Sequence, residues 1–319
     1  MDIDPKDLVK ISITQLIKFA DSFAGIEVHL PVNQKFIKLN YADEQFIDIL
    51  RKLQQKDVHE IYVQATDCKR ILTQIQDSLS PKSFYDPKTI PEDKIETLES
   101  SLAIVKSVIG QLGVTEENVK LLKTINTRSM AMLNESPSIF AFVKRFKKNC
   151  SEEYMKCVLT TFVMSLIIDK FPWKSDMVKE KGALASLLCD MVLLKDDFEL
   201  IKEWEKNGGT ELPDRIRSHP AEVAENLRVK RNIIPPETIT IVEQHHELPD
   251  GKGFPFGITA NRFNQLSCIF IVSQRFIEEL FEADFDFEKR FEIIKKLQTK
   301  YASKSFDKAL DALVGVVDV

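Results

Sequence analysis

Two adjacent histidines open the segment of this 319-residue chain that is richest in side chains able to do chemistry. The whole chain has five histidines and ten glycines, yet this segment and the two residues after it hold two of the histidines and three of the glycines. Imidazoles and carboxylates bind transition metals, and glycines allow a tight turn beside them. The clustering predicts a site rather than packing, in the segment His245-His246-Glu247-Leu248-Pro249-Asp250-Gly251-Lys252-Gly253-Phe254-Pro255.

We expect both histidines to lie on a helix that is opened by Pro235 and Pro236. Residues three and four apart share one face of a helix. The first histidine therefore points the same way as Ile241, and the second the same way as Val242. Inward-pointing imidazoles are placed as metal ligands would be, and core histidines satisfied by hydrogen bonds are the alternative.

Two further residues qualify as ligands. Asp190 lies in residues 183–194, a helical run that is apolar on every face, and a carboxylate buried there needs a metal ion, a cation or several hydrogen-bond donors. A buried ion pair and metal ligation are both open for it. His219 precedes Pro220, which suits the first position of a helix, so we expect His219 at a helix N-terminus, as a cap or as a ligand.

These segments resemble the HD-GYP family, bacterial metal-dependent phosphodiesterases that open cyclic-di-GMP. The pattern HHE-x-x-DG-x-G-[YF]-P is similar to the family's signature, and residues 187–193 (LLCDMVL) stand where the family has LLHDIGK. From about residue 132 onward the order of helices also matches. The resemblance implies four metal ligands, Asp190, His219, His245 and His246. It also implies a loop that borders the site, formed by Glu247, Asp250, Gly251, Gly253, Phe254 and Pro255.

Several positions depart from the family's pattern. Cys189 replaces the histidine of the HD pair, Leu193 the lysine that meets the substrate phosphate, and Phe254 the tyrosine of the loop. The family's first ligand histidine has no counterpart, because the sequence holds no histidine between His59 and His219. The family's last ligand, an aspartate, is replaced by Gln274 or Arg275.

Sorted by metal ion, these departures leave one of the family's two sites with Asp190 alone, and Cys189 as a substitute. The other site keeps its whole ligand set. The resemblance therefore implies at most one transition-metal ion, iron, manganese or zinc, or none. Arg275 is a candidate replacement for the missing cation, paired with Asp190; the alternative is that Gln274 points inward and Arg275 reaches the surface.

The leading functional interpretation is a degenerate HD-GYP protein that is non-catalytic or weakly active. It would act in cyclic-di-GMP signalling by binding cyclic-di-GMP or a signalling protein. The alternative is a metal-dependent cyclic-di-GMP phosphodiesterase with a mononuclear or Cys189-assisted site. A purely structural interaction protein is a third possibility. Metal content separates the three, and the sequence does not indicate an oligomeric state.

The predicted fold is mainly α, with a helical HD-type domain preceded by a small α+β module. The module occupies residues 1–78, with helices at 8–19, 42–53 and 68–78 and strands at 26–30, 35–39 and 59–64. Its order of elements resembles a domain that precedes HD-GYP domains in one bacterial subgroup. A linker and connecting helices fill 79–131, and the degenerate HD-GYP domain fills 132–319. Beyond the linker we expect helices at about 93–112, 115–131, 136–148, 151–170, 175–194, 196–206, 220–230, 236–247, 263–282, 287–302 and 304–314.

The composition argues against several classes of partner. A net charge of -5 with scattered lysines gives no case for a nucleic-acid polymer. The longest nearly uncharged stretch, Cys157 to Ile168, is too short to cross a bilayer, and the N-terminus lacks the apolar core of an export signal. Five cysteines without a CxxC pair suggest reduced thiols, so we expect a cytoplasmic protein.

Overall fold

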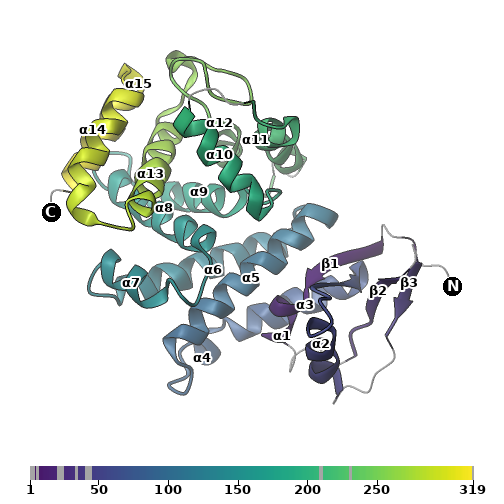
Figure 1. Ribbon diagram of the computed structural model, residues 1–319. Coiled ribbons are helices and arrows are strands. Elements are labelled where there is room, and N and C mark those ends of the chain that lie inside the picture. The colour runs from purple at the N-terminus through teal and green to yellow at the C-terminus, as the bar shows by residue number, and fades with distance from the viewer. Residues whose placement is uncertain are drawn as a thin grey trace. The chain divides into compact units, whose positions relative to one another are not determined.

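The computed structural model describes residue 4 and residues 7–19, 25–32, 35–39, 45–207, 211–229 and 232–317. The chain divides into two compact units. Unit 1 comprises Met1–Met132 with Lys148–Cys150, and unit 2 comprises Leu133–Lys147 with Ser151–Val319. Helices predominate in the described residues and the strands are confined to the N-terminal part of the chain (Figure 1), as the sequence predicted.

Unit 1 contains a four-stranded antiparallel sheet with the strand order β1-β4-β2-β3. In β1 and β4, Val9 pairs with Val63 and Ile11 with Ile61, and all four side chains are buried. Alternate residues of a strand point to one face, so these β-branched side chains form the covered face of the sheet. The strands are β1 (Leu8–Ser12), β2 (Val28–Val32), β3 (Lys35–Lys38) and β4 (Glu60–Gln64).

The helix predicted over 8–19 is wrong for its first half. Leu8–Ser12 is strand β1, and helix α1 covers only Ile13–Ile17. Apolar residues at 8, 9, 11 and 13 fit a period of two as well as a helical period. The pairing of β1 with β4, some fifty residues later in the chain, decides between them, and a local pattern cannot show that pairing.

Helices α3 and α5 pack against β1 and against each other. Pro91 opens α5, and Gly113 follows its last residue with a φ of 83°, a left-handed conformation that suits glycine. The predicted linker contains a short helix that Ser80 caps through the backbone N–H of Ser83. The helices of this part of the chain are α2 (Phe46–Gln54), α3 (Ala65–Ser78), α4 (Pro81–Phe84), α5 (Pro91–Leu112) and α6 (Glu116–Asn134), whose last residues belong to unit 2.

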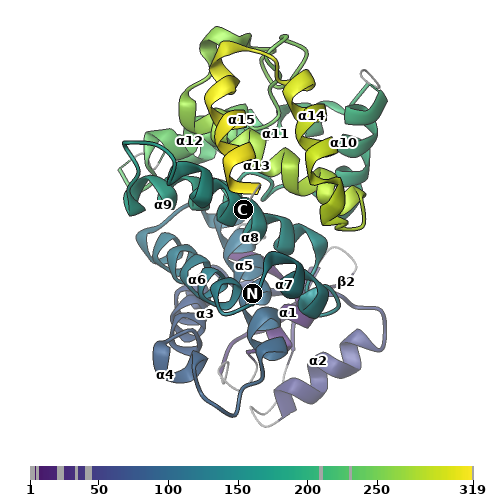
Figure 2. The same cartoon turned by 90° about the vertical axis from the view of Figure 1, so that its left-hand side faces the viewer.

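Unit 2 is built around α13 (Gln265–Glu282), which is buried on every side from Leu266 to Ile277. It contacts α8, α12, α14 and α15, and Figure 2 shows α14 and α15 in yellow beside it. The elements of unit 2 are α7 (Ile139–Phe146), α8 (Glu152–Ile168), α9 (Asp176–Leu188), α10 (Lys195–Asn207), α11 (Asp214–Arg228), α12 (Pro236–Gln244), η4 (Ala260–Arg262), α13, η5 (Phe287–Lys289), α14 (Arg290–Lys300) and α15 (Lys304–Val317).

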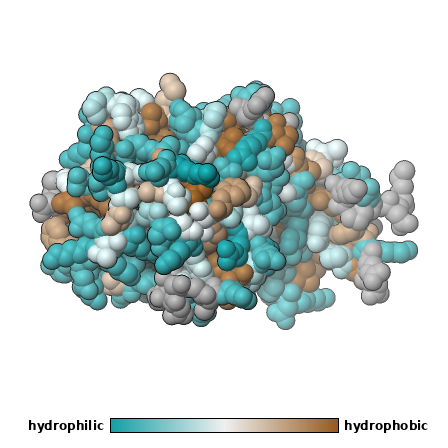
Figure 3. Space-filling view, turned by 90° about the horizontal axis from the view of Figure 1, so that it is seen from above, coloured by the Kyte–Doolittle hydropathy of each residue, from teal (hydrophilic) through white to brown (hydrophobic). Residues whose placement is uncertain are grey.

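Two features of the surface are plain. On the face seen in Figure 3, hydrophobic residues are scattered among hydrophilic ones rather than gathered in one patch. Within the described ranges, none of the helices is both long enough and apolar enough to pass through a bilayer.

Candidate metal centre

Asp190, His219, His245 and His246 come together within unit 2, with one ligand atom from each residue inside 4.8 Å of the others. The Oδ1 atom of Asp190 lies 3.2 Å from Nε2 of His219 and 3.2 Å from Nε2 of His245. These two nitrogens are 3.3 Å apart, and Nε2 of His246 is farther from the carboxylate, at 3.8 Å. Over the part of the chain that the structure describes, this is the one such cluster found.

Asp190 lies in a turn, not in the helix that was predicted to reach residue 194. Helix α9 ends at Leu188, and the next backbone bonds, from Met191 to Leu188 and from Leu193 to Asp190, are those of turns. This turn brings the Asp190 carboxylate to the Nε2 atoms of His219 and His245. The carboxylate thus lies where it could bind a cation together with the imidazoles.

The imidazole of His219 is held by a backbone carbonyl oxygen that the following proline leaves without its helical donor. The prediction that Pro220 opens the helix is wrong, because α11 begins at Asp214 and both residues lie inside it. Since Pro220 has no backbone N–H, the carbonyl oxygen of Ile216 lacks its helical donor, and Nδ1 of His219 lies 2.7 Å from that oxygen. The imidazole donates through Nδ1, which leaves the lone pair of Nε2 facing Asp190.

His245 is held in the same way at the end of α12. The predicted helix 236–247 stops at Gln244, so both adjacent histidines lie just beyond it. The carbonyl oxygen of Val242, near the helix end, is 2.6 Å from Nδ1 of His245. His246 differs, because its Nδ1 lies 2.9 Å from Nη2 of Arg275 on α13.

The cluster fits a metal ion. In neutral imidazoles that donate through Nδ1, the Nε2 atoms of His219 and His245 are acceptors, as is Oδ1 of Asp190. Three acceptors 3.2–3.3 Å apart, two of them fully buried, repel one another unless a positive charge lies between them. A tetrahedral ion with bonds of about 2.0 Å separates its ligands by about 3.3 Å, as zinc would.

An apolar group covers the cluster. The ring of Phe254 stacks on His246 with centroids 4.6 Å apart, and Trp204 meets Phe254 edge-on at 5.0 Å. Leu193, the predicted counterpart of the family's lysine, packs against the same group, which comprises Ile201, Trp204, Leu212, Ile216 and Phe254. The imidazole side chains are 0–3% exposed, and Asp190 retains 19%.

The predicted loop residues shape the turn and lie outside the metal cluster. Glu247 is buried, and its carboxylate accepts the backbone N–H groups of Phe256 at 2.7 Å and Ile258 at 3.0 Å. Burial raises the pKa of Glu247, and these backbone bonds lower it by less. The carboxylate of Asp250 accepts the backbone N–H of Lys252.

The two glycines of this loop are required by its backbone. Gly251 has a φ of 79°, in the left-handed region. A Cβ on Gly253 would lie 2.3 Å from the backbone nitrogen of Leu248, so only glycine fits there. Pro255 follows a cis peptide bond.

The residues proposed to replace lost ligands take other partners. Cys189 donates to Oδ2 of Asp190 at 3.3 Å and is not a member of the metal cluster. Arg275 is buried, so the surface position considered for it is wrong, and Gln274 is buried beside it. Arg275 pairs with Glu278 at 2.6 Å and with Nδ1 of His246 at 2.9 Å, and the charge of Asp190 also acts on its guanidinium. Burial lowers the pKa of Arg275, and Glu278, Tyr301 and Asp190 together raise it above its usual value.

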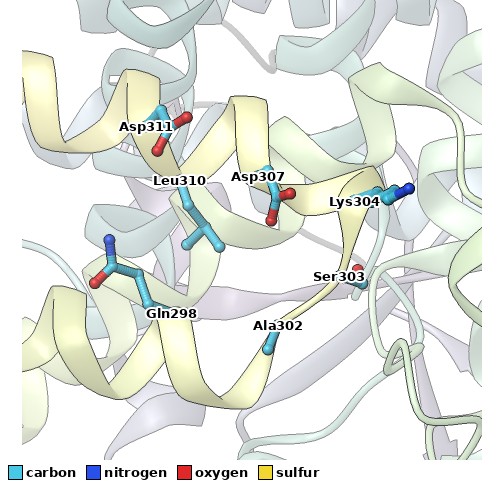
Figure 4. Close-up of a pocket in the computed structure, with 7 residues that line it drawn as sticks. All are labelled: Gln298, Ala302, Ser303, Lys304, Asp307, Leu310 and Asp311. Atoms are coloured by element: carbon cyan, nitrogen blue, oxygen red, sulfur yellow. The ribbon is translucent and has the colours of Figure 1, made fainter.

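A cavity of about 600 Å³ lies elsewhere in unit 2, between α14 and α15 (Figure 4). Its lining includes Gln298 from α14 and the carboxylates Asp307 and Asp311 from α15. It shares no residue with the metal cluster.

Comparison with known proteins finds the fold but no close relative. No family model matches the sequence, and no curated protein does. A solved structure, Bd1817, described as a HDG"Y"P protein from Bdellovibrio bacteriovorus, matches with a TM-score of 0.55 and 16% sequence identity. The match covers 98% of this chain and 100% of that one. The resemblance inferred from the histidine segment is thus confirmed at the level of the fold: this chain folds like an HD-GYP protein, with a helical HD-type domain after a small α+β module.

Proposed function

We propose that this protein is a non-catalytic or weakly active HD-GYP-type protein that holds one transition-metal ion and acts in cyclic-di-GMP signalling by binding a ligand or a partner protein. The ion would be iron, manganese or zinc, bound within the cluster of Asp190, His219, His245 and His246. The observation that carries the proposal is one compact ligand cluster beneath an apolar cover.

The surroundings of Asp190 argue against a second metal ion. Its other oxygen, Oδ2, has the Cys189 thiol at 3.3 Å. On the α13 side, the guanidinium of Arg275 lies against His246. The permanent positive charge of this guanidinium, 2.9 Å from the His246 imidazole, disfavours a second cation beside the cluster. Only the ion in the histidine cluster then has a full set of ligands.

The cover over the cluster argues against hydrolysis. Two-metal phosphodiester hydrolysis uses both ions to activate water and to neutralise the phosphate. Here Leu193 and Phe254 offer no hydrogen-bond donor to a phosphate, and the imidazoles are closed off from solvent. Each lost electrostatic contribution is worth on the order of 2–4 kcal/mol in the transition state, so several losses together suppress turnover by many orders of magnitude.

Metal analysis of the purified full chain tests the proposal. We expect about one equivalent of metal, lost in His245→Ala and kept in His59→Ala, whose histidine lies outside the cluster. The iron- or manganese-loaded protein should hydrolyse cyclic-di-GMP negligibly, and calorimetry with the same nucleotide would show whether it binds. Two fully occupied metal ions, or robust turnover that His245→Ala abolishes, would contradict the proposal.

One observation favours the alternative, a phosphodiesterase with a mononuclear or Cys189-assisted site. Asp190 retains 19% exposure, and the thiol of Cys189 lies beside it. If this alternative holds, the single-metal protein turns over cyclic-di-GMP, and Cys189→Ser reduces the rate without removing the metal. A protein that purifies without metal and binds none on addition would instead favour a structural interaction protein.

A further inference from the structure

The hydrogen bond between Arg275 and His246 fixes the position of the proton on that imidazole. An arginine guanidinium donates hydrogen bonds and cannot accept them. Because Nη2 of Arg275 lies 2.9 Å from Nδ1 of His246, that nitrogen must accept. The ring is then neutral and carries its single N–H at Nε2, the nitrogen that faces the metal cluster.

The other two imidazoles have the opposite tautomer. Nδ1 of His219 and Nδ1 of His245 each lie within 2.7 Å of a backbone carbonyl oxygen, which can only accept. Their hydrogens are on Nδ1, and their Nε2 lone pairs face the cluster. Two of the three histidines are therefore prepared as ligands, while the third presents a hydrogen in the same direction.

We propose that Arg275 takes His246 out of the ligand set. The metal ion is bound by Asp190, His219 and His245, and Nε2–H of His246 donates a hydrogen bond to a small anion that occupies the fourth position. This inference rests on the single metal ion of the proposed function. It changes the role of His246 from ligand to hydrogen-bond donor.

The distances agree with this division. The three proposed ligand atoms are 3.2–3.3 Å apart, whereas Nε2 of His246 is 3.8 Å from Oδ1 of Asp190, beyond hydrogen-bonding distance. Nε2 of His246 is also buried without a hydrogen-bond partner. A buried donor costs free energy until it finds an acceptor. The fourth position of the metal ion would bring an acceptor to it.

The charges indicate which ligand would fill that position. With a divalent ion bound, the ion and Arg275 exceed the carboxylates of Asp190 and Glu278 by one positive charge. A monoanion neutralises that excess in a site closed to water. Because Phe254 stacks directly on His246, the anion would have to be small, such as hydroxide or azide, rather than a nucleotide.

Arg275 is itself firmly positioned. It lies on the central helix α13 with its side chain 5% exposed, and Nη1 is bonded to Glu278 one turn later at 2.6 Å. The ion pair directs the other terminal nitrogen toward His246. Arg275 is therefore a positioning residue that acts on the metal centre through the imidazole.

The tautomers can be read directly by nitrogen NMR. Long-range proton–nitrogen spectra of the full chain labelled with ¹⁵N-histidine contain five imidazoles, which single histidine variants assign. We expect Nε2–H for His246, with or without zinc, and Nδ1–H for His219 and His245. An Nδ1–H signal for His246 would overturn the inference. Because the metal-free protein is measured too, this result does not depend on metal binding, and failure of the proposed function stays distinguishable.

Zinc affinity, measured by chelator competition, gives a second readout. His246→Ala should weaken binding by about 10–100-fold, the range usual for residues outside the ligand shell. His245→Ala should weaken it by more than about 100-fold. Equal losses for the two variants would refute the division of roles.

Azide titration of the cobalt-loaded protein tests the fourth position. We expect azide to shift the visible absorption bands of the wild-type protein and its affinity to fall at least tenfold in His246→Ala.

Arg275→Met should tighten zinc binding and abolish the response to azide, because His246 is then able to bind the ion through Nε2. Arg228→Met, which removes an arginine paired with Glu225 and Glu243 on the surface, should alter neither. Absence of an azide response in the cobalt-loaded wild type would reject the fourth position, and His246→Ala decides the matter if Arg275→Met does not fold.

Discussion

Asp197 stabilises the helix that covers the metal cluster. Its carboxylate is fully buried and accepts the backbone N–H of Leu194 at 2.8 Å, which closes the first turn of α10. Both oxygens also accept from Arg215 on α11. Further along α10, Ile201 and Trp204 pack over Phe254. Asp197→Ala should therefore loosen the cover while leaving every proposed ligand in place.

The magnitude follows from those contacts. A hydrogen bond from a backbone N–H to a charged acceptor contributes about 1.5–3 kcal/mol. The guanidinium of Arg215 is 56% exposed, so water screens its pair with Asp197, and we add nothing for it. We expect Asp197→Ala to lower the free energy of unfolding by about 1.5–3 kcal/mol. Asp196→Ala, next to it but exposed, is the matched control.

The effect should depend on pH with a defined sign. The hydrogen bond from Arg215 is the main cause that lowers the pKa of Asp197 below its usual 3.8. A carboxyl whose folded pKa is depressed stabilises the protein above its unfolded pKa, and loses that contribution as the pH falls through the folded value. The difference between Asp197→Ala and wild type should be constant near pH 7 and shrink below about pH 4.

Tryptophan fluorescence provides the assay. The chain has two tryptophans, so Trp173→Phe leaves Trp204, within the cover, as the only reporter. Urea denaturation followed at Trp204 gives the stability of unit 2, and the rate of zinc release to a chelator should rise in Asp197→Ala. The reasoning fails if Asp197→Ala and Asp196→Ala differ by less than about 0.5 kcal/mol, the usual spread of surface substitutions.

Three further predictions concern the loop and the thiols. Gly253→Ala should displace the loop and quench or shift Trp204 fluorescence. The new Cβ would lie 2.3 Å from the backbone nitrogen of Leu248, which is too close for the loop to keep its position. Burial raises the pKa of Glu247 above 4.5, so its contribution to stability is complete below pH 4.5 and is lost as the pH rises through the raised pKa. In urea denaturation at pH 5 and pH 8, Glu247→Gln should therefore lose this part of the pH dependence of stability. Burial raises the pKa of Cys68 and of Cys268 to about 12, so at pH 8 both should resist iodoacetamide until the protein unfolds, as mass spectrometry of alkylated peptides would show.

The sequence located the candidate site because histidines are rare in this chain and two of the five are adjacent. Three of its five histidines meet Asp190 in the folded protein. The glycine spacing likewise indicated a loop whose backbone only glycine permits, at Gly251 and Gly253. Both inferences depend on the identity of single residues, which a sequence states outright.

Backbone conformation around the ligands was harder to predict. The apolar run through residue 194 favoured a continuous helix, but the chain turns after Leu188 and so brings the Asp190 carboxylate to the imidazoles. Pro220 suggested a helix start, whereas its effect inside α11 is to free the carbonyl oxygen of Ile216 for His219. In each case tertiary contacts outweigh the local preference.

Arg275 shows most clearly where inference from sequence ends. A buried carboxylate and an arginine at a vacated ligand position suggest an ion pair, yet the fold gives each group further partners that the sequence did not indicate. Glu278 lies one helical turn from Arg275, so their pairing costs little chain entropy, and Asp190 is already surrounded by imidazoles. The remaining guanidinium nitrogen then meets His246. Which nitrogen of an imidazole carries its hydrogen depends on such a contact, and that choice separates a ligand from a donor. Two adjacent histidines in a sequence are equivalent; in this fold a proline-freed carbonyl, a helix end and one arginine make the three imidazoles unequal.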